Sequence, residues 1–254
     1  MTTDLFRAQS ALVLEDVAGK YGFAAPDLAR EELVVVPLPR GAREGMVALV
    51  VTAGLGTVVS VEPELVEWVR EHAPADKHFR AMQPFFLAEL AEEARRRGFA
   101  SAQAYGSSLG FALSKRFPNP RLSDRLRLIP VDAEWMARHR DSNVFDNALG
   151  EPHETHRIER TLHGFAIVDD GSDPLGVAGT WGEGPIRDEI GVDVRRDARG
   201  LGLAKALVGA AIEDILERGR VPFYSCGATN IRSHRNALAC GFEPVFLMGM
   251  VAER

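Results

Sequence analysis

Short apolar runs alternate with helical patterns along the second half of this chain. The runs that predict strands are separated by turn-forming residues and cover 125–129, 164–168, 175–181, 189–194, 222–226 and 244–251. Apolar residues at helical spacing follow Asp132, Gly202 and Asn230, and two of these, Asp132 and Asn230, are residue types that cap helices. The predicted order is strand, helix, three strands, helix, strand, helix, strand.

The first half of the chain has its own mixed pattern. Strands are predicted at residues 32–38, 45–51 and 56–61, and helices at residues 63–72 and 84–97. Pro118 and Pro120 then interrupt both helix and strand, so we expect a boundary there. The expected organisation is an N-terminal α/β domain of uncertain role at 1–120 and a second α/β domain at 121–254.

A loop with very small side chains joins the predicted strand at 189–194 to the helix that follows it. Gly200, Gly202 and Ala204 leave the start of this helix almost bare, and Arg199 adds a positive charge beside it. The first amides of a helix are unpaired and carry the positive end of the helix dipole. Residues 200–204, including Leu201 and Leu203, therefore predict a backbone cradle for phosphate groups.

The spacing of the glycines excludes two common phosphate loops. A P-loop needs Gly-x-x-x-x-Gly-Lys-Ser/Thr, which is absent, and the third glycine of a dinucleotide fingerprint is replaced by Lys205. A nucleotide or dinucleotide enzyme is therefore disfavoured.

The remaining pattern, Arg199-x-x-Gly202-x-Ala204, resembles the acetyl-CoA motif of the GNAT superfamily of N-acetyltransferases. A second stretch, from Asn230 through a helix to Gly241 and Phe242, is similar to the segment that follows in that family. The resemblance covers about residues 125–254 and implies a mixed central sheet with flanking helices. The first half lacks the motif, so it is either a degenerate GNAT-like half or an unrelated cap.

The resemblance also implies where acetyl-CoA would bind as co-substrate, without a metal. Val192 and Val194 would offer backbone groups to the pantetheine arm and the thioester. The loop from Gly200 to Ala204 would take the pyrophosphate with Arg199 at its edge, and Asn230 would contact the pantetheine arm.

A carboxylate is the candidate base for deprotonating an amine. Alternation places Glu189, Gly191 and Asp193 on one face of their strand, so Glu189 is the first candidate and Asp193 the second. The alternative for Glu189 is a solvated acid paired with Arg187. The family's usual acid, a tyrosine, is replaced by Ala237, and its role is not transferred to Tyr224.

Composition limits the other classes of function. The chain of 254 residues has a net charge of -6 and no basic tract, which argues against nucleic acid as a partner. Two cysteines, no signal peptide and no membrane-spanning run predict a cytoplasmic protein without a membrane partner. His153 and His156 lack a third metal ligand at suitable spacing and are interpreted as solvated loop residues.

Two functions from different classes follow from these patterns. The first is an N-acetyltransferase that transfers the acetyl group of acetyl-CoA directly to a primary amine of a small molecule or protein. The second is a catalytically inactive coenzyme A-binding module with a regulatory or interaction role. Acceptor specificity is expected in residues 149–160 and in the first half, and the assembly state, with a homodimer among the alternatives, stays open.

Overall fold

The computed structural model describes residues 2–140, 144–150, 161–170, 173–182 and 184–253. The segment 151–160, which includes His153 and His156, lies outside these residues. The elements of the first half are α1 (Thr2–Tyr21), η1 (Ala25–Ala29), β1 (Leu33–Pro37), β2 (Met46–Thr52), β3 (Thr57–Val61), η2 (Pro63–Leu65), α2 (Val66–His72), η3 (Ala75–Met82), α3 (Pro84–Arg96) and β4 (Gln103–Leu113). Those of the second half are β5 (Arg127–Val131), α4 (Ala133–Arg140), α5 (Asp146–Leu149), β6 (Thr161–Val168), β7 (Pro174–Gly182), β8 (Arg187–Val194), η4 (Arg196–Ala198), α7 (Leu203–Glu217), β9 (Val221–Gly227), α8 (Ile231–Ala239) and β10 (Phe242–Ala252).

The chain forms two compact units that are not contiguous in sequence. The first unit contains Met1–Gln9, Ala112–Tyr224 and Arg232–Glu243, and the second contains Ser10–Phe111, Ser225–Ile231 and Pro244–Arg254. The domain boundary at residue 120 stays a prediction, because short C-terminal segments belong to the unit that holds most of the N-terminal half.

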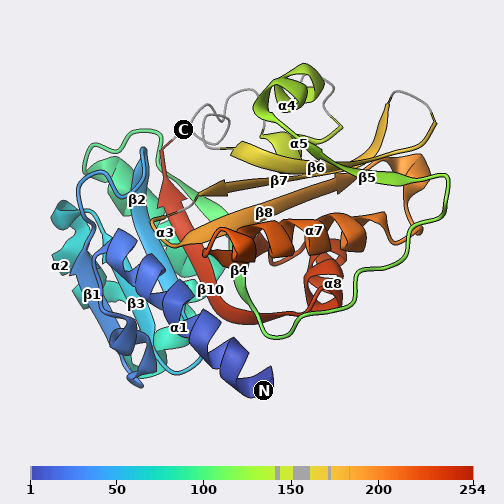
Figure 1. The fold of residues 1–254 in the computed structure, drawn as a ribbon. Helices are drawn as coiled ribbons and strands as arrows, with labels where there is room; N and C mark the ends of the chain where they lie inside the picture. The colour runs from blue at the N-terminus through green and yellow to red at the C-terminus, as the bar shows by residue number, and fades with distance from the viewer. Residues whose placement is uncertain (1, 141–143, 151–160, 171–172, 183, 254) are drawn as a thin grey trace. The chain divides into compact units, whose positions relative to one another are not determined.

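The first unit is a twisted layer of strands with helices on both faces. Its strands are hydrogen-bonded in the order β5-β6-β7-β8-β9, antiparallel as far as β8 and parallel between β8 and β9. Side chains alternate between the two faces of a strand. Ala166 and Val177 pack with residues of α4 and α5, whereas Ile167 and Ala178 pack with α7. The two helical layers therefore lie on opposite faces, as Figure 1 shows.

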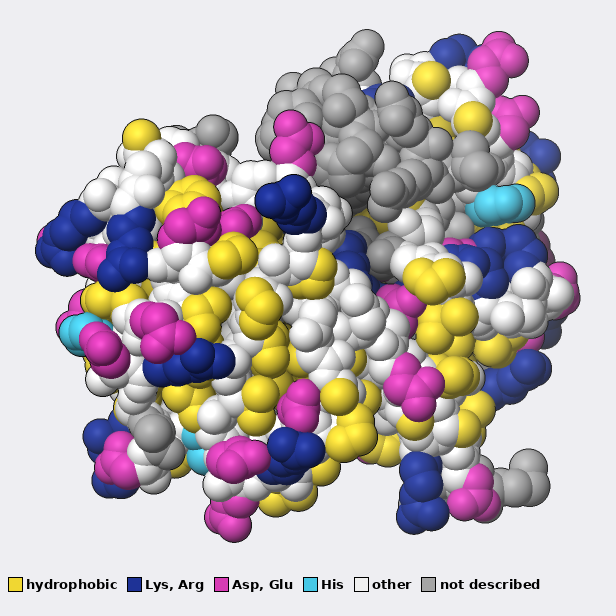
Figure 2. Space-filling model, turned by 90° about the vertical axis from the view of Figure 1, so that its left-hand side faces the viewer, with side chains coloured by type: hydrophobic (Ala, Val, Ile, Leu, Met, Phe, Trp, Pro, Cys, Tyr) yellow, Lys and Arg dark blue, Asp and Glu magenta, His cyan; other side chains and the backbone are white. Residues whose placement is uncertain are grey.

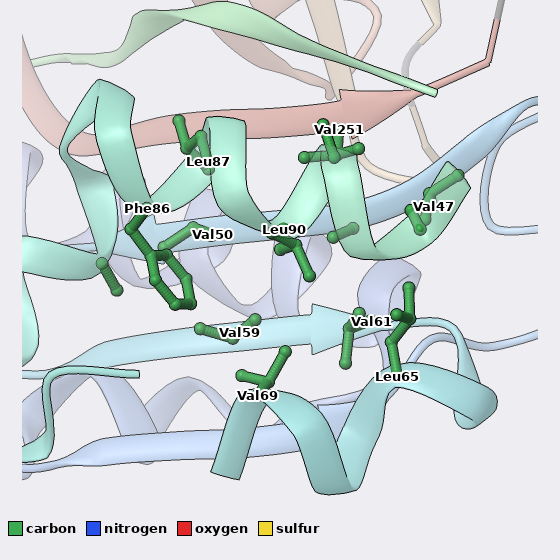
Figure 3. Close-up of a cluster of buried hydrophobic side chains, with 14 of the residues drawn as sticks. Val47, Val50, Val59, Val61, Leu65, Val69, Phe86, Leu87, Leu90 and Val251 are labelled. Atoms are coloured by element: carbon green, nitrogen blue, oxygen red, sulfur yellow. The ribbon is translucent and has the colours of Figure 1, made fainter. Parts of the chain in front are cut away.

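The second unit has a core between its strands and two of its helices. Its strand order is β1-β3-β2-β10-β4, in which β1 and β3 are parallel and β2 is antiparallel to both of its neighbours. Figure 3 shows how apolar side chains of α2 and α3 meet those of the strands. The labelled members are Val47, Val50, Val59, Val61, Leu65, Val69, Phe86, Leu87, Leu90 and Val251.

The predicted order of elements in the second half is confirmed, with shifts of a few residues at the ends. Asp132 caps α4 as expected, because its Oδ1 accepts a hydrogen bond from the Trp135 amide at 2.8 Å. The strands and helices predicted for the first half are also found. The pattern did not predict α1, β4 or the short helix α5.

Both cysteines are free and buried, and each unit holds one. Cys226 lies in β9 within the second unit, and Cys240 follows α8 in the first unit. Burial raises the pKa of the Cys240 thiol to about 12.

On the surface, acidic and basic side chains are intermixed over the face drawn in Figure 2. None of the described helices combines the length and the apolar character that crossing a membrane requires.

Candidate functional site

The loop between β8 and α7 is built around two glycines in a conformation that other residues rarely adopt. Gly200 has φ 86° and Gly202 has φ 77°, both in the left-handed region. A Cβ built on either residue meets no other atom within 4 Å. Glycine is therefore needed here for backbone conformation, and the space above both residues is open to a ligand.

The first turn of α7 presents amides that the helix itself does not use. The carbonyl of Gly202 accepts hydrogen bonds from the amides of Lys205 at 3.1 Å and Ala206 at 3.3 Å, which starts the helical pattern. The amides of Leu203 and Ala204 precede these bonds and have no carbonyl of the helix as partner. Glycine at the N-cap also offers no side chain to cap them. Unused amides at the start of a helix favour a negatively charged group beside them, so this helix terminus has the chemistry that the sequence predicted for a phosphate cradle.

Packing of buried apolar side chains holds the loop between β8 and α7 in place. Ala198 and Leu203 are 4% and 2% exposed and pack with Ala206 and Leu207 against β6 and β7. The side chains of Val192 and Val194 pack partly against the same cluster. The predicted cofactor residues of the loop and of β8 are thus held by one apolar core.

Three arginines line an open hollow of about 690 Å³ in the first unit. They are Arg196 and Arg199, on either side of Ala198, and Arg232 in the first turn of α8. All three side chains are exposed, and Arg199 Nε donates a hydrogen bond to the carbonyl of Val194 at 3.2 Å. Among the described residues, none of the three has an acidic partner in an ion pair. The hollow therefore has a positive potential that suits an anionic ligand.

A fourth arginine nearby is neutralised. Arg195 Nε donates to Asp197 Oδ1 at 3.1 Å, and its Nη2 reaches Oδ2 of the same carboxylate. This hydrogen-bonded pair lowers the pKa of Asp197 and raises the pKa of Arg195. The single carboxylate within the loop is thereby compensated.

Strands β8 and β9 pair over only part of their length. Their register runs from Arg187 opposite Val221 to Glu189 opposite Phe223. Strand β8 continues for five residues, Ile190 to Val194, beyond this last pair, and these residues still pair with β7 on the other side. Glu189 therefore stands where pairing between the two parallel strands ends, and Val192 and Val194 lie beyond that point.

The face of β8 that carries Glu189 also carries the contacts that hold α5. A Cβ on Gly191 would lie 1.8 Å from the carbonyl oxygen of Asn147, so only glycine fits beneath α5. Asp193 Oδ1 accepts a hydrogen bond from Asn147 Nδ2 at 2.7 Å, and Oδ2 accepts one from the Ala148 amide at 3.0 Å. Asp193 thus anchors α5, and burial raises the pKa of its carboxyl despite these bonds.

An ionic network around the buried Asp188 fixes the start of β8 next to Glu189. Asp188 is 3% exposed, and its two oxygens accept hydrogen bonds from Arg218 Nη1 at 2.5 Å and Arg220 Nε at 2.6 Å. Arg218 also binds Asp214 at 2.8 Å. The Arg220 guanidinium donates further to the backbone carbonyls of Gly184, Pro185 and Arg187. Glu189 is therefore carried by a rigid piece of backbone.

The helix α8 contains the position at which the family usually has a tyrosine. Ala237 is fully buried there and has no proton to give. The Tyr224 hydroxyl and Ser233 Oγ are 2.8 Å apart, which ties β9 to the first turn of α8. Asn230 immediately precedes α8 and belongs to the second unit, where its amide donates to the Gly227 carbonyl at 2.9 Å.

The structure brings most of the predicted site residues together in the first unit. These are Glu189, Val192, Val194, Arg199, Gly200, Leu201, Gly202, Leu203 and Ala204. Their roles stay predictions. The sequence reasoning missed Arg196 and Arg232, although both stand within a few residues of the two motifs, and a charge count around the loop would have found Arg196.

Comparison with known proteins bears on the same segment. Residues 131–242 match the sequence model of the Acetyltransferase (GNAT) family. Comparison with curated proteins finds no match.

Solved structures that resemble the chain include a GCN5-related N-acetyltransferase-like protein from Streptococcus suis, with a TM-score of 0.50 and 15% identity over 98% of this chain and 100% of that one. A GCN5-related N-acetyltransferase from Kribbella flavida has a TM-score of 0.49 and 14% identity over 98% and 95% of the two chains. At such identities the Streptococcus suis structure shows a shared fold, one that extends through both units. Together with the sequence match, the loop geometry leads to one assignment: residues 131–242 form a domain of the GNAT acetyltransferase family.

Proposed function

We propose that this protein transfers the acetyl group of acetyl-CoA directly to a primary amine of a small molecule or a protein. The observation that carries the proposal is the bare N-terminus of α7. It combines left-handed glycines, unused amides and an open hollow lined by arginines. This donor set fits the diphosphate of coenzyme A, because backbone amides and guanidinium groups are the usual partners of phosphate oxygens.

The part of β8 beyond its last pair with β9 would hold the pantetheine arm. That arm contains two amides, and an open strand edge can pair with amides as it would with another strand. In this proposal the backbone groups of Val192 and Val194 bind and orient the arm, with Asn230 contributing from the start of α8. Such positioning supplies much of the rate enhancement in a transfer between two bound reactants.

Glu189 is proposed as the base that prepares the acceptor. Acetyl-CoA would supply a thioester. Its carbonyl carbon is reactive toward amines, and its leaving group is a thiolate. Glu189 takes the proton of the incoming ammonium, directly or through water, so that the nitrogen lone pair becomes available. Its place at the end of the β8–β9 pairing supports this role, because the acceptor and the pantetheine arm would meet there.

No proton donor for the departing thiolate is proposed. The residue at the usual position is Ala237, and the Tyr224 hydroxyl is engaged with Ser233. A thiolate is a stable leaving group near neutral pH, since the pKa of a free thiol is about 8.5. Two free cysteines are typical of proteins in a reducing compartment, which supports the proposed cytoplasmic location of the activity.

The test is calorimetric titration of the purified chain with acetyl-CoA, together with a thiol-release assay over a panel of amines. Binding in the micromolar range with amine-dependent thiol release is the expected result. Binding without release on any amine of the panel would contradict transfer to those amines and favour a coenzyme A-binding module. Absence of binding would overturn the proposal.

A further inference from the structure

Strand β1 stands at one end of the strand order in the second unit (Figure 1). Among the described strands it pairs only with β3, in parallel. The Glu32 carbonyl accepts a hydrogen bond from a β3 amide at 3.1 Å, and the Leu38 amide donates to a β3 carbonyl at 2.7 Å. Backbone groups alternate in direction along a strand, so the even-numbered residues face β3, and Leu33 and Val35 direct their amides and carbonyls outward.

The outer side of β1 is suited to pairing with a further strand. Within the part of the chain that the structure describes, no hydrogen bond reaches the outward backbone groups of Leu33 and Val35. Residues 33–36 are all apolar and all half-buried. Unpaired backbone groups along an apolar strand are a template for another strand.

Strand β5, at the end of the strand order of the first unit, is protected against such pairing. It contains Pro130, which has no amide proton, and begins with the charged Arg127. Prolines and charged residues are common devices that keep the edge of a sheet from pairing. In β1 the proline is Pro37, the last residue of the strand, so it follows the residues whose amides face outward. The chain therefore blocks one strand edge and leaves the other able to pair.

Exposed charges on either side of β1 favour a second copy of the same strand as its partner. Glu31 and Glu32 precede the strand, and Arg40 and Arg43 follow it, all with exposed side chains. Glu32 has a partner in Arg30, at 3.6 Å. Neither Arg40 nor Arg43 forms an ion pair with any residue that the structure describes. When two identical strands pair antiparallel, the acidic start of each lies beside the basic segment that follows the other, so the edge is complementary to itself.

We infer that β1 is the interface of a homodimer, in which it pairs antiparallel with β1 of a second copy of this chain. A two-fold axis at Val34 sets Leu33 of each copy opposite Val35 of the other, which forms about four backbone hydrogen bonds. This axis also brings α2 of both copies to the same face of the joined sheet, because Leu33 and Val35 pack with residues of α2. An interface of this modest size fits a dissociation constant of roughly 1–100 µM.

The test is sedimentation velocity over a range of protein concentrations, with charge exchanges on either side of β1. The parent chain is expected to show a reversible equilibrium between monomer and dimer. Glu31→Lys and Arg40→Glu each act twice in a symmetric dimer and should weaken dimerisation about fivefold or more, because each places like charges together. The double variant exchanges the two signs and should restore the parent affinity to within about twofold.

Two further variants separate the strand edge from general effects of charge. Glu89→Lys is the matched control, since Glu89 is exposed on α3 of the same unit and the substitution changes the net charge equally. It should leave dimerisation unchanged. Val35→Pro removes an outward amide while the bonds to β3 are kept, and it should weaken dimerisation about tenfold or more, with circular dichroism to verify the fold.

The outcomes decide the inference without reference to acetyl transfer, because the measurement uses no ligand. A parent chain that stays monomeric overturns it. A dimer that Glu31→Lys and Arg40→Glu weaken no more than Glu89→Lys does overturns it as well.

Discussion

At the scale of single residues, the candidate site depends on the backbone conformation of a glycine and on the surroundings of two carboxylates. Gly202 must be glycine for its conformation, and its missing side chain also keeps the helix terminus open. Glu189 and Asp193 share one strand face, and Asp193 accepts hydrogen bonds from the Asn147 side chain and the Ala148 amide of α5. Replacing the carboxylate by an amide is therefore expected to affect catalysis at Glu189 and protein stability at Asp193.

The first prediction concerns the phosphate cradle. Gly202→Glu places a carboxylate beside the unused amides of α7 and should weaken acetyl-CoA binding at least 100-fold, because like charges in a partly desolvated site repel strongly. Gly219→Glu is the matched control. Gly219 has φ 71° at the other end of α7 and equally open space around its Cβ, so it carries the same backbone strain.

Calorimetric titration of both variants, with circular dichroism to verify the fold, measures the effect. Unchanged affinity in Gly202→Glu, or an equal loss in Gly219→Glu, would show that the cradle is not at this helix terminus.

The second prediction concerns the base. Glu189→Gln should lower kcat by about 100-fold or more, since general-base catalysis contributes factors of this size. The affinity for acetyl-CoA should stay within twofold of the parent value, because the proposed cofactor contacts are made by other residues. Asp193→Asn, the same chemical change on the same strand face, should keep kcat. A Glu189→Gln rate that matches the parent rate at every pH would make Glu189 structural.

At the scale of elements, helix α5 shows how a segment of four residues is held by its environment. Asp193 accepts from the Asn147 side chain and the Ala148 amide, and Gly191 allows the backbone of α5 to lie directly on β8. An isolated helix this short is not stable in water. Contacts with strand β8 therefore stabilise the helical conformation of α5.

The third prediction follows from the raised pKa of Asp193. The folded protein holds the proton of this carboxyl more tightly than the unfolded chain, whose Asp pKa is about 3.9. Stability from this group is thus fully present below pH 4 and is lost as the pH rises through the raised folded pKa. Asp193→Asn removes this pH dependence. It should also lower the free energy of unfolding by about 1–2 kcal/mol, because one of the two hydrogen-bond donors loses its acceptor.

Urea unfolding of both proteins between pH 4 and pH 8 measures the difference in the free energy of unfolding. The free energy of unfolding of the parent should exceed that of Asp193→Asn by less as the pH rises. A constant or growing advantage would contradict the assigned pKa direction.

The sequence pattern predicted those elements whose determining residues lie within the element or directly beside it in sequence. The loop at residues 199–204 combines glycine conformations and a helix start within six positions, and Asp132 caps the helix that it precedes. The pattern missed α5 because its stability comes from Asp193, a residue distant in sequence. It missed α1 because the buried apolar residues in the described part of that helix, Val13, Val17, Ala18 and Tyr21, are confined to its C-terminal half.

At the scale of the whole molecule, the division into units was beyond the sequence pattern. The apolar alternation of β10 predicts a strand, but it does not say that Leu247 to Ala252 pair with β2. Nor does it assign residues 225–231 to the second unit. The arginine hollow was missed for the same reason, since Arg196 and Arg232 meet only after folding.

The fourth prediction uses the buried thiols. The raised pKa of Cys240, about 12, leaves roughly one thiolate in ten thousand at pH 8, and the side chain is fully buried. Iodoacetamide should therefore label Cys240 in the native protein at least 100-fold more slowly than a free cysteine. Labelling at the rate of free cysteine would show that the folded chain exposes this residue.

Since each unit carries one of the two thiols, the chain contains its own pair of reporters. Mass spectrometry of peptides alkylated in brief pulses across a urea titration would follow Cys226 and Cys240 separately. Coincident curves mean that the units unfold together, whereas displaced curves tell which unit opens first. Repeating the pulses with bound acetyl-CoA would then show whether ligand protection stops at the unit that contains the α7 loop or extends to both.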